Sequence, residues 1–190
     1  YSLLDGACRI KELVLRVKEL GQKAVAVTDH GNMFAAVEFY NECLAQGIKP
    51  IIGCEVYVAP RTRFDKLAKI DSSPYHLVLL CENNEGYQNL IKLVSAAYTE
   101  GFYSKPRVDV ELLEKYHNGL ICLSACLAGE IPRKLTNGDY EAAKQTALKY
   151  RDIFGRDNYF IELQNHKFAD QQRILPMLIK LSRETGIPMV

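Results

Sequence analysis

The feature that most restricts the fold of this chain is the repeated exchange of two hydrophobic periods along its length. Short β-branched runs such as AVAVT (24–28) and YHLVLLC (75–81) alternate with longer segments whose apolar residues recur every three or four positions. Short apolar runs are typical of buried strands, and the longer spacing is typical of amphipathic helices. We therefore predict an α/β protein in which six strands alternate with helices.

The predicted elements follow one another closely. Strands are predicted at 24–28, 49–60, 75–81, 119–125, 158–165 and 187–190, and helices at 8–20, 32–46, 83–100, 110–117, 139–154 and about 169–185. Right-handed crossovers between parallel strands build either an open doubly wound sheet or a closed barrel, and both place functional groups at the carboxyl ends of the strands. Alternation alone does not choose between the two.

Composition narrows the class of protein. The 190 residues predict a single domain spanning 1–190, and the net charge of +1 argues against a dedicated electrostatic nucleic-acid binder. No apolar run approaches the roughly 18 residues of a membrane span, so the default expectation is a cytoplasmic protein with no membrane partner. The six cysteines form no C-x-x-C pair, which predicts free thiols that pack as small hydrophobes, with Cys126 as the exception.

Several strand ends carry side chains that bind metals. Asp29 and His30 close the first predicted strand, and Gly31 after them permits a sharp turn. Glu55 lies between apolar neighbours in the second strand, where a buried carboxylate is costly without a cation or metal beside it. Metal-assisted phosphoester hydrolysis needs imidazole and carboxylate ligands held on separate strands that converge on one rim.

Of three further candidates, two also have a plain structural alternative. His76 heads the third strand and also fits a satisfied core histidine, whereas Cys126 follows the fourth strand where a thiolate is able to bind zinc. Asp5 precedes the first helix and fits an N-cap. His117 is predicted to be a surface residue at a helix end, and His166 alone in a loop gives no signal.

One basic segment and several missing motifs complete the pattern. Residues 61–73, RTRFDKLAKIDSS, carry four basic residues with little periodicity, which fits a solvated, mobile loop or, alternatively, a phosphate-contacting one. The chain has no G-x-G-x-x-G, Walker A or G-x-S-x-G sequence, so dinucleotide binding, P-loop hydrolysis and elbow-serine catalysis have no support.

Several stretches, taken together, resemble a known family. They are YSLLDG, AVAVTDHGNMF, IKPIIGCEVYV, YHLVLLCENNEGYQNLIKLVSAAYTEGF and GLICLSACLAGEIP, which span nearly the whole chain. In this order they resemble the amino-terminal PHP (polymerase and histidinol phosphatase) domain of bacterial replicative DNA polymerases of the C family. The resemblance implies a distorted (β/α)7 barrel and a cluster of two or three divalent metals, zinc, manganese or iron, at the carboxyl rim.

Carried over residue by residue, the family's metal ligands fall on Asp5, His30, Glu55, His76 and Cys126. The family also carries a His-x-His pair before YSLLDG and an Asp-x-His pair after IPMV, and neither pair is in this sequence. We therefore expect a barrel truncated at both ends, as part of a longer polypeptide.

The resemblance implies a replicative polymerase that partners DNA, its own polymerase body and other replisome subunits, with magnesium at a polymerase site outside this chain. The retained ligands favour a metal-dependent phosphoesterase that acts as a 3′ to 5′ proofreading exonuclease. Two alternatives remain: a non-catalytic module that supports the polymerase or docks an exonuclease, and a phosphatase of small esters similar to histidinol phosphatase.

Overall fold

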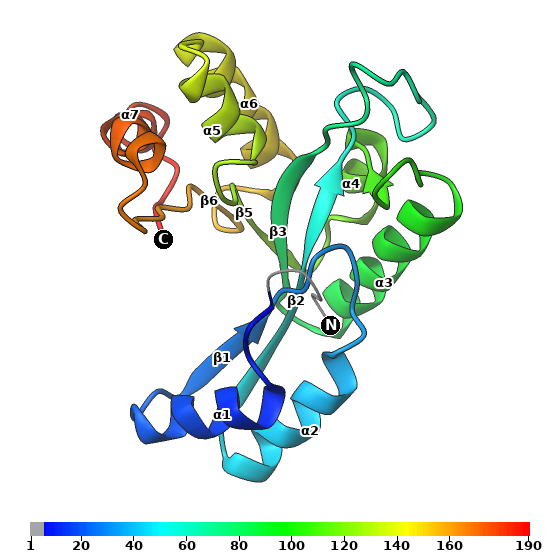
Figure 1. Cartoon of the computed structure of the whole chain (residues 1–190), viewed down its shortest axis with the longest axis vertical. Helices are drawn as coiled ribbons and strands as arrows, with labels where there is room; N and C mark the ends of the chain where they lie inside the picture. The colour runs from blue at the N-terminus through cyan, green and yellow to red at the C-terminus, as the bar shows by residue number, and fades with distance from the viewer. Residues whose placement is uncertain (1–5) are drawn as a thin grey trace.

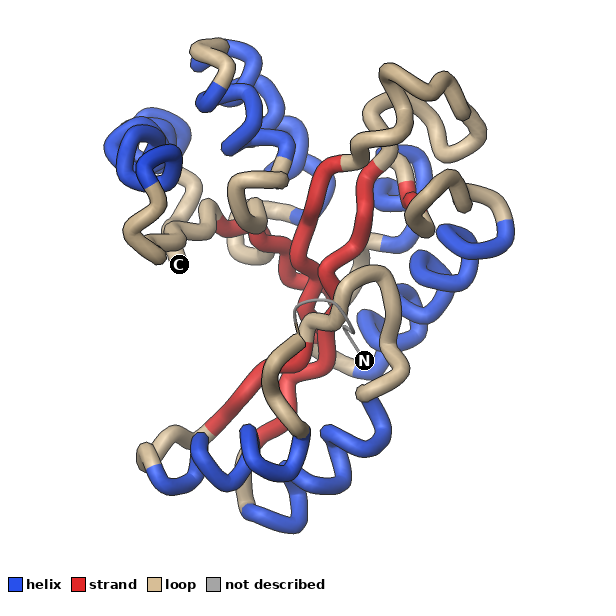
Figure 2. Tube along the Cα trace, in the orientation of Figure 1, coloured by secondary structure: helices blue, strands red, loops and turns tan. Residues whose placement is uncertain are grey.

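The computed structural model describes residues 6–190, and its centre is one mixed sheet of six strands (Figures 1 and 2). The strands are β1 (Ala24–Val27), β2 (Lys49–Val58), β3 (Tyr75–Cys81), β4 (Arg107–Val108), β5 (Leu120–Leu123) and β6 (Tyr159–Phe160). Their order is β1-β2-β3-β5-β6, with β4 added beside the end of β2. The long strand β2 crosses the middle of the molecule and joins the lower β1 region to the upper sheet (Figure 2).

Seven helices surround this sheet within the described residues. They are α1 (Ile10–Glu19), α2 (Ala36–Gln46), α3 (Asn84–Thr99), α4 (Val110–Tyr116), α5 (Glu130–Thr136), α6 (Tyr140–Phe154) and α7 (Ala169–Thr185). Local signals set their ends, because the carboxylates of Asp109 and Asp139 cap α4 and α6, and Gly47 and Gly186 end α2 and α7 in the left-handed region.

The apolar residues form two separate cores. A small one joins α1, α2 and β1, and includes Val14, Phe39 and Cys43. The larger one fills the space between the upper sheet and the helices α3 to α7, where Leu79 and Leu113 are fully buried. Helix α1 therefore packs on α2 and β1, and α2 packs on the lower part of β2, apart from the other five helices (Figure 1).

The α/β class and most predicted elements are confirmed, but the all-parallel sheet is wrong. Strand β3 runs antiparallel to both β2 and β5, whereas β1 and β2, and β5 and β6, are parallel pairs. No helix separates β2 from β3, and a chain without a crossover helix returns antiparallel. The predicted last strand at 187–190 contributes only one bridge, between Ile161 and Met189.

Other expectations need smaller corrections. The second helix begins at Ala36 rather than at Asn32, because the Asn32 side chain accepts the Phe34 N–H and donates to the His30 carbonyl in a turn. The first helix begins at Ile10 with Arg9 as its N-cap, and Asp5, for which capping is one interpretation, lies outside the described residues. Cys8 is exposed rather than packed, although all six thiols are free.

The basic segment 61–73 is tied to the sheet by ion pairs, and Arg63 and Asp71 within it are buried rather than solvated as one interpretation expected. Arg61 donates two hydrogen bonds to the carboxylate of Asp71, whose side chain is fully buried. Arg63 is also buried and donates to the carboxylates of Asp109 and Glu100. Arg107, from β4, is fully buried and reaches the same segment. These side chains fold the loop onto the end of the sheet.

Protonation of the Asp71 carboxylate in acid should loosen the 61–73 loop. The hydrogen bonds from Arg61 lower the pKa of the Asp71 carboxyl below its ordinary value. A lowered pKa stabilises the fold above the ordinary value of about 4, and that stabilisation is lost as the pH falls through the lowered value. We therefore expect hydrogen exchange of the 61–73 amides, corrected for intrinsic pH dependence, to accelerate only at strongly acidic pH. Asp71→Asn should exchange fast already at pH 7; slow exchange in that variant would contradict the assignment.

Candidate metal centre

Glu55 lies within β2, at a point where the backbone pairing continues beyond the end of β1. The Glu55 N–H donates to the Asp29 carbonyl at 3.0 Å, and the Gly31 N–H donates to the Glu55 carbonyl at 2.9 Å. This bridge places His30 directly beside Glu55. Gly31 has φ of 65°, and a Cβ there would lie 2.9 Å from the Tyr57 ring, so both conformation and space require glycine.

His76 reaches the same face of the sheet through the antiparallel register. Glu55 is paired with Val78 and Tyr57 with His76. Paired residues project to one face and alternate residues share it, so His76 is the diagonal neighbour of Glu55. The His76 N–H donates to the Ala128 carbonyl, which ties the start of β3 to the loop that follows β5.

Cys126 comes from that loop after β5. Ala125 has φ of 63°, a left-handed conformation unusual for a residue with a Cβ, and it turns the chain toward His76. The Ala128 N–H donates to the Cys126 Sγ at 3.4 Å, and this Sγ lies 3.7 Å from the Nδ1 of His76. These two contacts place the Cys126 sulfur beside the His76 ring.

The side chains converge on one carboxylate oxygen. The Glu55 Oε1 lies 2.7 Å from the Nδ1 of His30 and 2.8 Å from the Nδ1 of His76. Ligand atoms of Glu55, His76 and Cys126 all lie within 4.8 Å of one another, close enough to hold one ion. Carboxylate, imidazole and thiolate together form a donor set typical of zinc and other borderline-soft divalent ions.

The electrostatics of the group match this donor set. Burial raises the pKa of the Glu55 carboxyl, but the hydrogen bonds and charges of His76 and His30 outweigh it, so the pKa is lowered overall. Burial lowers the pKa of His76, yet the contacts with Cys126 and Glu55 outweigh it and raise this pKa to about 9. The carboxylate therefore favours a proton on the His76 imidazole, a position that a metal ion is able to take instead.

Three of the five sequence-predicted ligands, Glu55, His76 and Cys126, thus come together, and His30 adjoins them through Glu55. Asp5 lies outside the described residues and stays a prediction. His117 lies at the end of α4 with its Nδ1 near the Glu114 carbonyl, and His166 is exposed, so neither belongs to the group.

The sequence interpretation missed two neighbours of the group. The Tyr57 ring meets the His76 ring edge-on with centroids 5.1 Å apart, and the Lys105 Nζ lies 5.2 Å from the Tyr57 centroid. Tyr57 is two residues after Glu55 in one strand, so the period of two could have placed it on the same face. Nothing in the sequence indicated Lys105, which comes from a distant loop.

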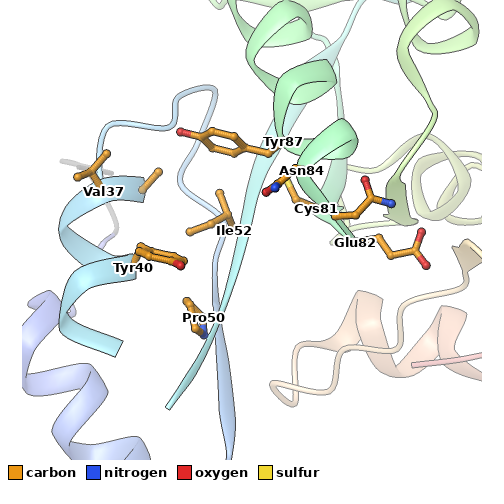
Figure 3. A pocket seen from close by; sticks show the side chains of 10 residues that line it. Val37, Tyr40, Pro50, Ile52, Cys81, Glu82, Asn84 and Tyr87 are labelled. Atoms are coloured by element: carbon orange, nitrogen blue, oxygen red, sulfur yellow. The ribbon is translucent and has the colours of Figure 1, made fainter. Parts of the chain in front are cut away.

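An apolar pocket of about 400 Å³ lies elsewhere, between α2, β2 and the start of α3. Figure 3 shows Val37 and Tyr40 of α2 facing Ile52, with Tyr87 of α3 across the gap. The pocket includes none of the candidate metal ligands, so the chemistry of the group does not depend on it.

The comparisons with known proteins place this architecture in a class. A solved amidohydrolase from Chromobacterium violaceum matches with a TM-score of 0.58 at 14% identity, covering 100% of this chain and 82% of that one. A candidate metal-dependent phosphoesterase from Bifidobacterium adolescentis matches with a TM-score of 0.54 at 11% identity, covering 97% and 81%. The fold is therefore the α/β fold shared by these proteins, in agreement with the expected distorted barrel.

Sequence similarity gives the family. Residues 1–166 match the PHP domain family, and the chain belongs to it. The chain is 53% identical to the DNA polymerase III subunit alpha of Treponema pallidum and 47% identical to that of Borreliella burgdorferi, in each case over 100% of its own length. It spans only 16% of the length of each of these relatives. No helix among residues 6–190 is long and apolar enough to cross a membrane.

Proposed function

We propose that this chain is the PHP portion of a bacterial DNA polymerase III alpha subunit and that its metal centre hydrolyses phosphodiesters. The convergence of Glu55, His76 and Cys126 carries the proposal, because their ligand atoms lie within 4.8 Å of one another, close enough to hold an ion. The identity of 53% to a DNA polymerase III alpha subunit supports the placement. The reaction that fits best is removal of a mismatched nucleotide from a 3′ end.

The donors present fit a divalent cation. Glu55 offers a carboxylate whose Oε1 already attracts two imidazoles, and Cys126 offers sulfur beside His76. We propose that these residues, with His30 and Asp5, hold two or three ions of zinc, manganese or iron. Such ions lower the pKa of a bound water and neutralise phosphate oxygens. His76 must give up its proton to act as a ligand, so metal loading should release protons near neutral pH.

The whole polypeptide would then carry a second activity. DNA synthesis would use magnesium at a polymerase site outside this chain, in a cytoplasmic assembly with other replisome subunits. The near-neutral charge of the chain agrees with this division, because DNA affinity would come mainly from the rest of the polymerase.

The test is excision by the full-length polypeptide. A 3′-mismatched primer is incubated without nucleotides, in the presence of manganese or zinc, and the loss of the terminal nucleotide is measured. We expect excision that a chelator abolishes and that manganese or zinc restores. Protein that lacks both bound metal and excision would favour the scaffold alternative, and hydrolysis of small phosphomonoesters without excision would favour the phosphatase alternative.

A further inference from the structure

Lys105 lies on the rim of the metal centre, although it is far from the ligands in sequence. Its Nζ is 5.2 Å from the Tyr57 ring centroid, and that ring meets His76 edge-on with centroids 5.1 Å apart. The ammonium is therefore no farther than about 10 Å from the centroid of the His76 ring. Phosphates in a stacked single strand are spaced about 3.4 Å apart, so this distance corresponds to at most roughly three phosphates.

The loop that carries Lys105 is fixed at its base. Ser104 has φ of 60°, an uncommon conformation for a residue with a side chain, and the Tyr103 N–H donates to the Lys105 carbonyl. Pro106 is buried against Gly31, and Arg107 is fully buried in the sheet. Lys105 itself is exposed, so an anchored backbone presents a solvent-accessible cation beside the centre.

The charge of Lys105 is not used within the described structure. Other basic side chains near the sheet are neutralised by carboxylates, as Arg63 is by Asp109 and Arg61 by Asp71. No ion pair among residues 6–190 includes Lys105, and its ammonium lies over the Tyr57 ring face. A cation held over an aromatic ring keeps its outer hydrogen-bond donors available to an anion.

We propose that Lys105 binds a backbone phosphate of a single nucleic-acid strand whose 3′ end lies at the Glu55, His76 and Cys126 group. The inference rests on the proposed phosphodiesterase function and names its substrate class: a strand with several phosphates rather than a small ester. Lys105 contacts the Tyr57 ring rather than a ligand atom, so we assign it to binding the strand and fixing its register and not to catalysis.

The first test compares substrates in the full-length protein. Lys105→Gln should raise the KM for a single-stranded oligonucleotide about fivefold to tenfold with little change in kcat, and reduce the salt dependence of log KM by about 0.7. The same variant should hydrolyse bis(p-nitrophenyl) phosphate at the wild-type rate and keep its bound metal. Lys11→Gln on α1 removes the same charge from an exposed site and should resemble the wild type. An unchanged oligonucleotide KM in Lys105→Gln would overturn the inference.

The second test does not require hydrolysis. The wild-type protein is acetylated with and without a saturating 3′-ended oligothymidylate, and the modification of each lysine is followed by mass spectrometry. The oligonucleotide should slow acetylation of Lys105 several-fold and leave Lys11 unaffected; equal rates at Lys105 would overturn the inference. A wild-type protein that protects Lys105 but hydrolyses nothing would instead refute the phosphodiesterase proposal while supporting strand binding.

Discussion

Glu55→Gln should remove the metal from the centre and reduce excision of a mismatched 3′ nucleotide by about 100-fold or more. Loss of a residue that merely supports a metal ligand typically costs about 10- to 100-fold, and Glu55 is a predicted ligand at the point where the side chains converge. The amide keeps the size of the side chain but loses the negative charge that holds His30, His76 and a cation together. Metal content and single-turnover excision measure the effect.

The matched control for that variant is Glu82→Gln. Glu82 directly follows the other end of β3 and is exposed, so its loss changes the net charge equally without touching the centre. Primer extension by the full-length polypeptide should survive both substitutions, since DNA synthesis is proposed to occur elsewhere. A Glu55→Gln protein that retains both its metal and its excision rate would show that the assigned centre is wrong.

The strand pattern predicted where the candidate ligands lie, but the pairing of β2 with β3 decided whether they meet. Hydrophobic alternation placed Glu55 within a strand and His76 at the start of the next. Hydrophobic alternation does not fix the register between the two strands. A shift of one residue in that register would turn His76 to the opposite face of the sheet. The sequence did hold one unused clue to strand direction: residues 61–73 lack helical periodicity, and a connection without a helix favours an antiparallel return.

The resemblance to the PHP family supplied what periodicity left open. On position alone His76 fitted a core histidine as well as a ligand, and the structure places its Nδ1 2.8 Å from the Glu55 Oε1. Lys105 escaped both kinds of reasoning, because its contact with Tyr57 joins a loop after α3 to the middle of the sheet. Contacts of this kind depend on tertiary packing, which local sequence patterns do not encode.

Arg107→Ala should cause the largest loss of stability around the rim, about 3 to 5 kcal/mol. The Arg107 side chain is fully buried and donates to the backbone carbonyls of Gly101, Asp71, Arg63 and Asp65. Alanine would leave these carbonyls without their donor and open a cavity between two loops. Burial lowers the pKa of Arg107, with Asp71 acting in the opposite direction, but a guanidinium stays charged at neutral pH.

Hydrogen exchange of the full-length protein should locate that loss. We expect the amides of 61–73 and 101–106 to exchange more than 100-fold faster in Arg107→Ala, which corresponds to the expected free energy at about 1.4 kcal/mol per tenfold change. Arg151→Ala removes an arginine paired with the mostly exposed Asp152, where such pairs contribute about 1 kcal/mol or less, and should leave both loops protected. Arg107→Lys should recover little protection, because one ammonium does not span carbonyls that a planar guanidinium reaches from several nitrogens. If the loops stayed protected in Arg107→Ala, the stability of the rim would have to come from the ion pairs of Arg61 and Arg63 instead.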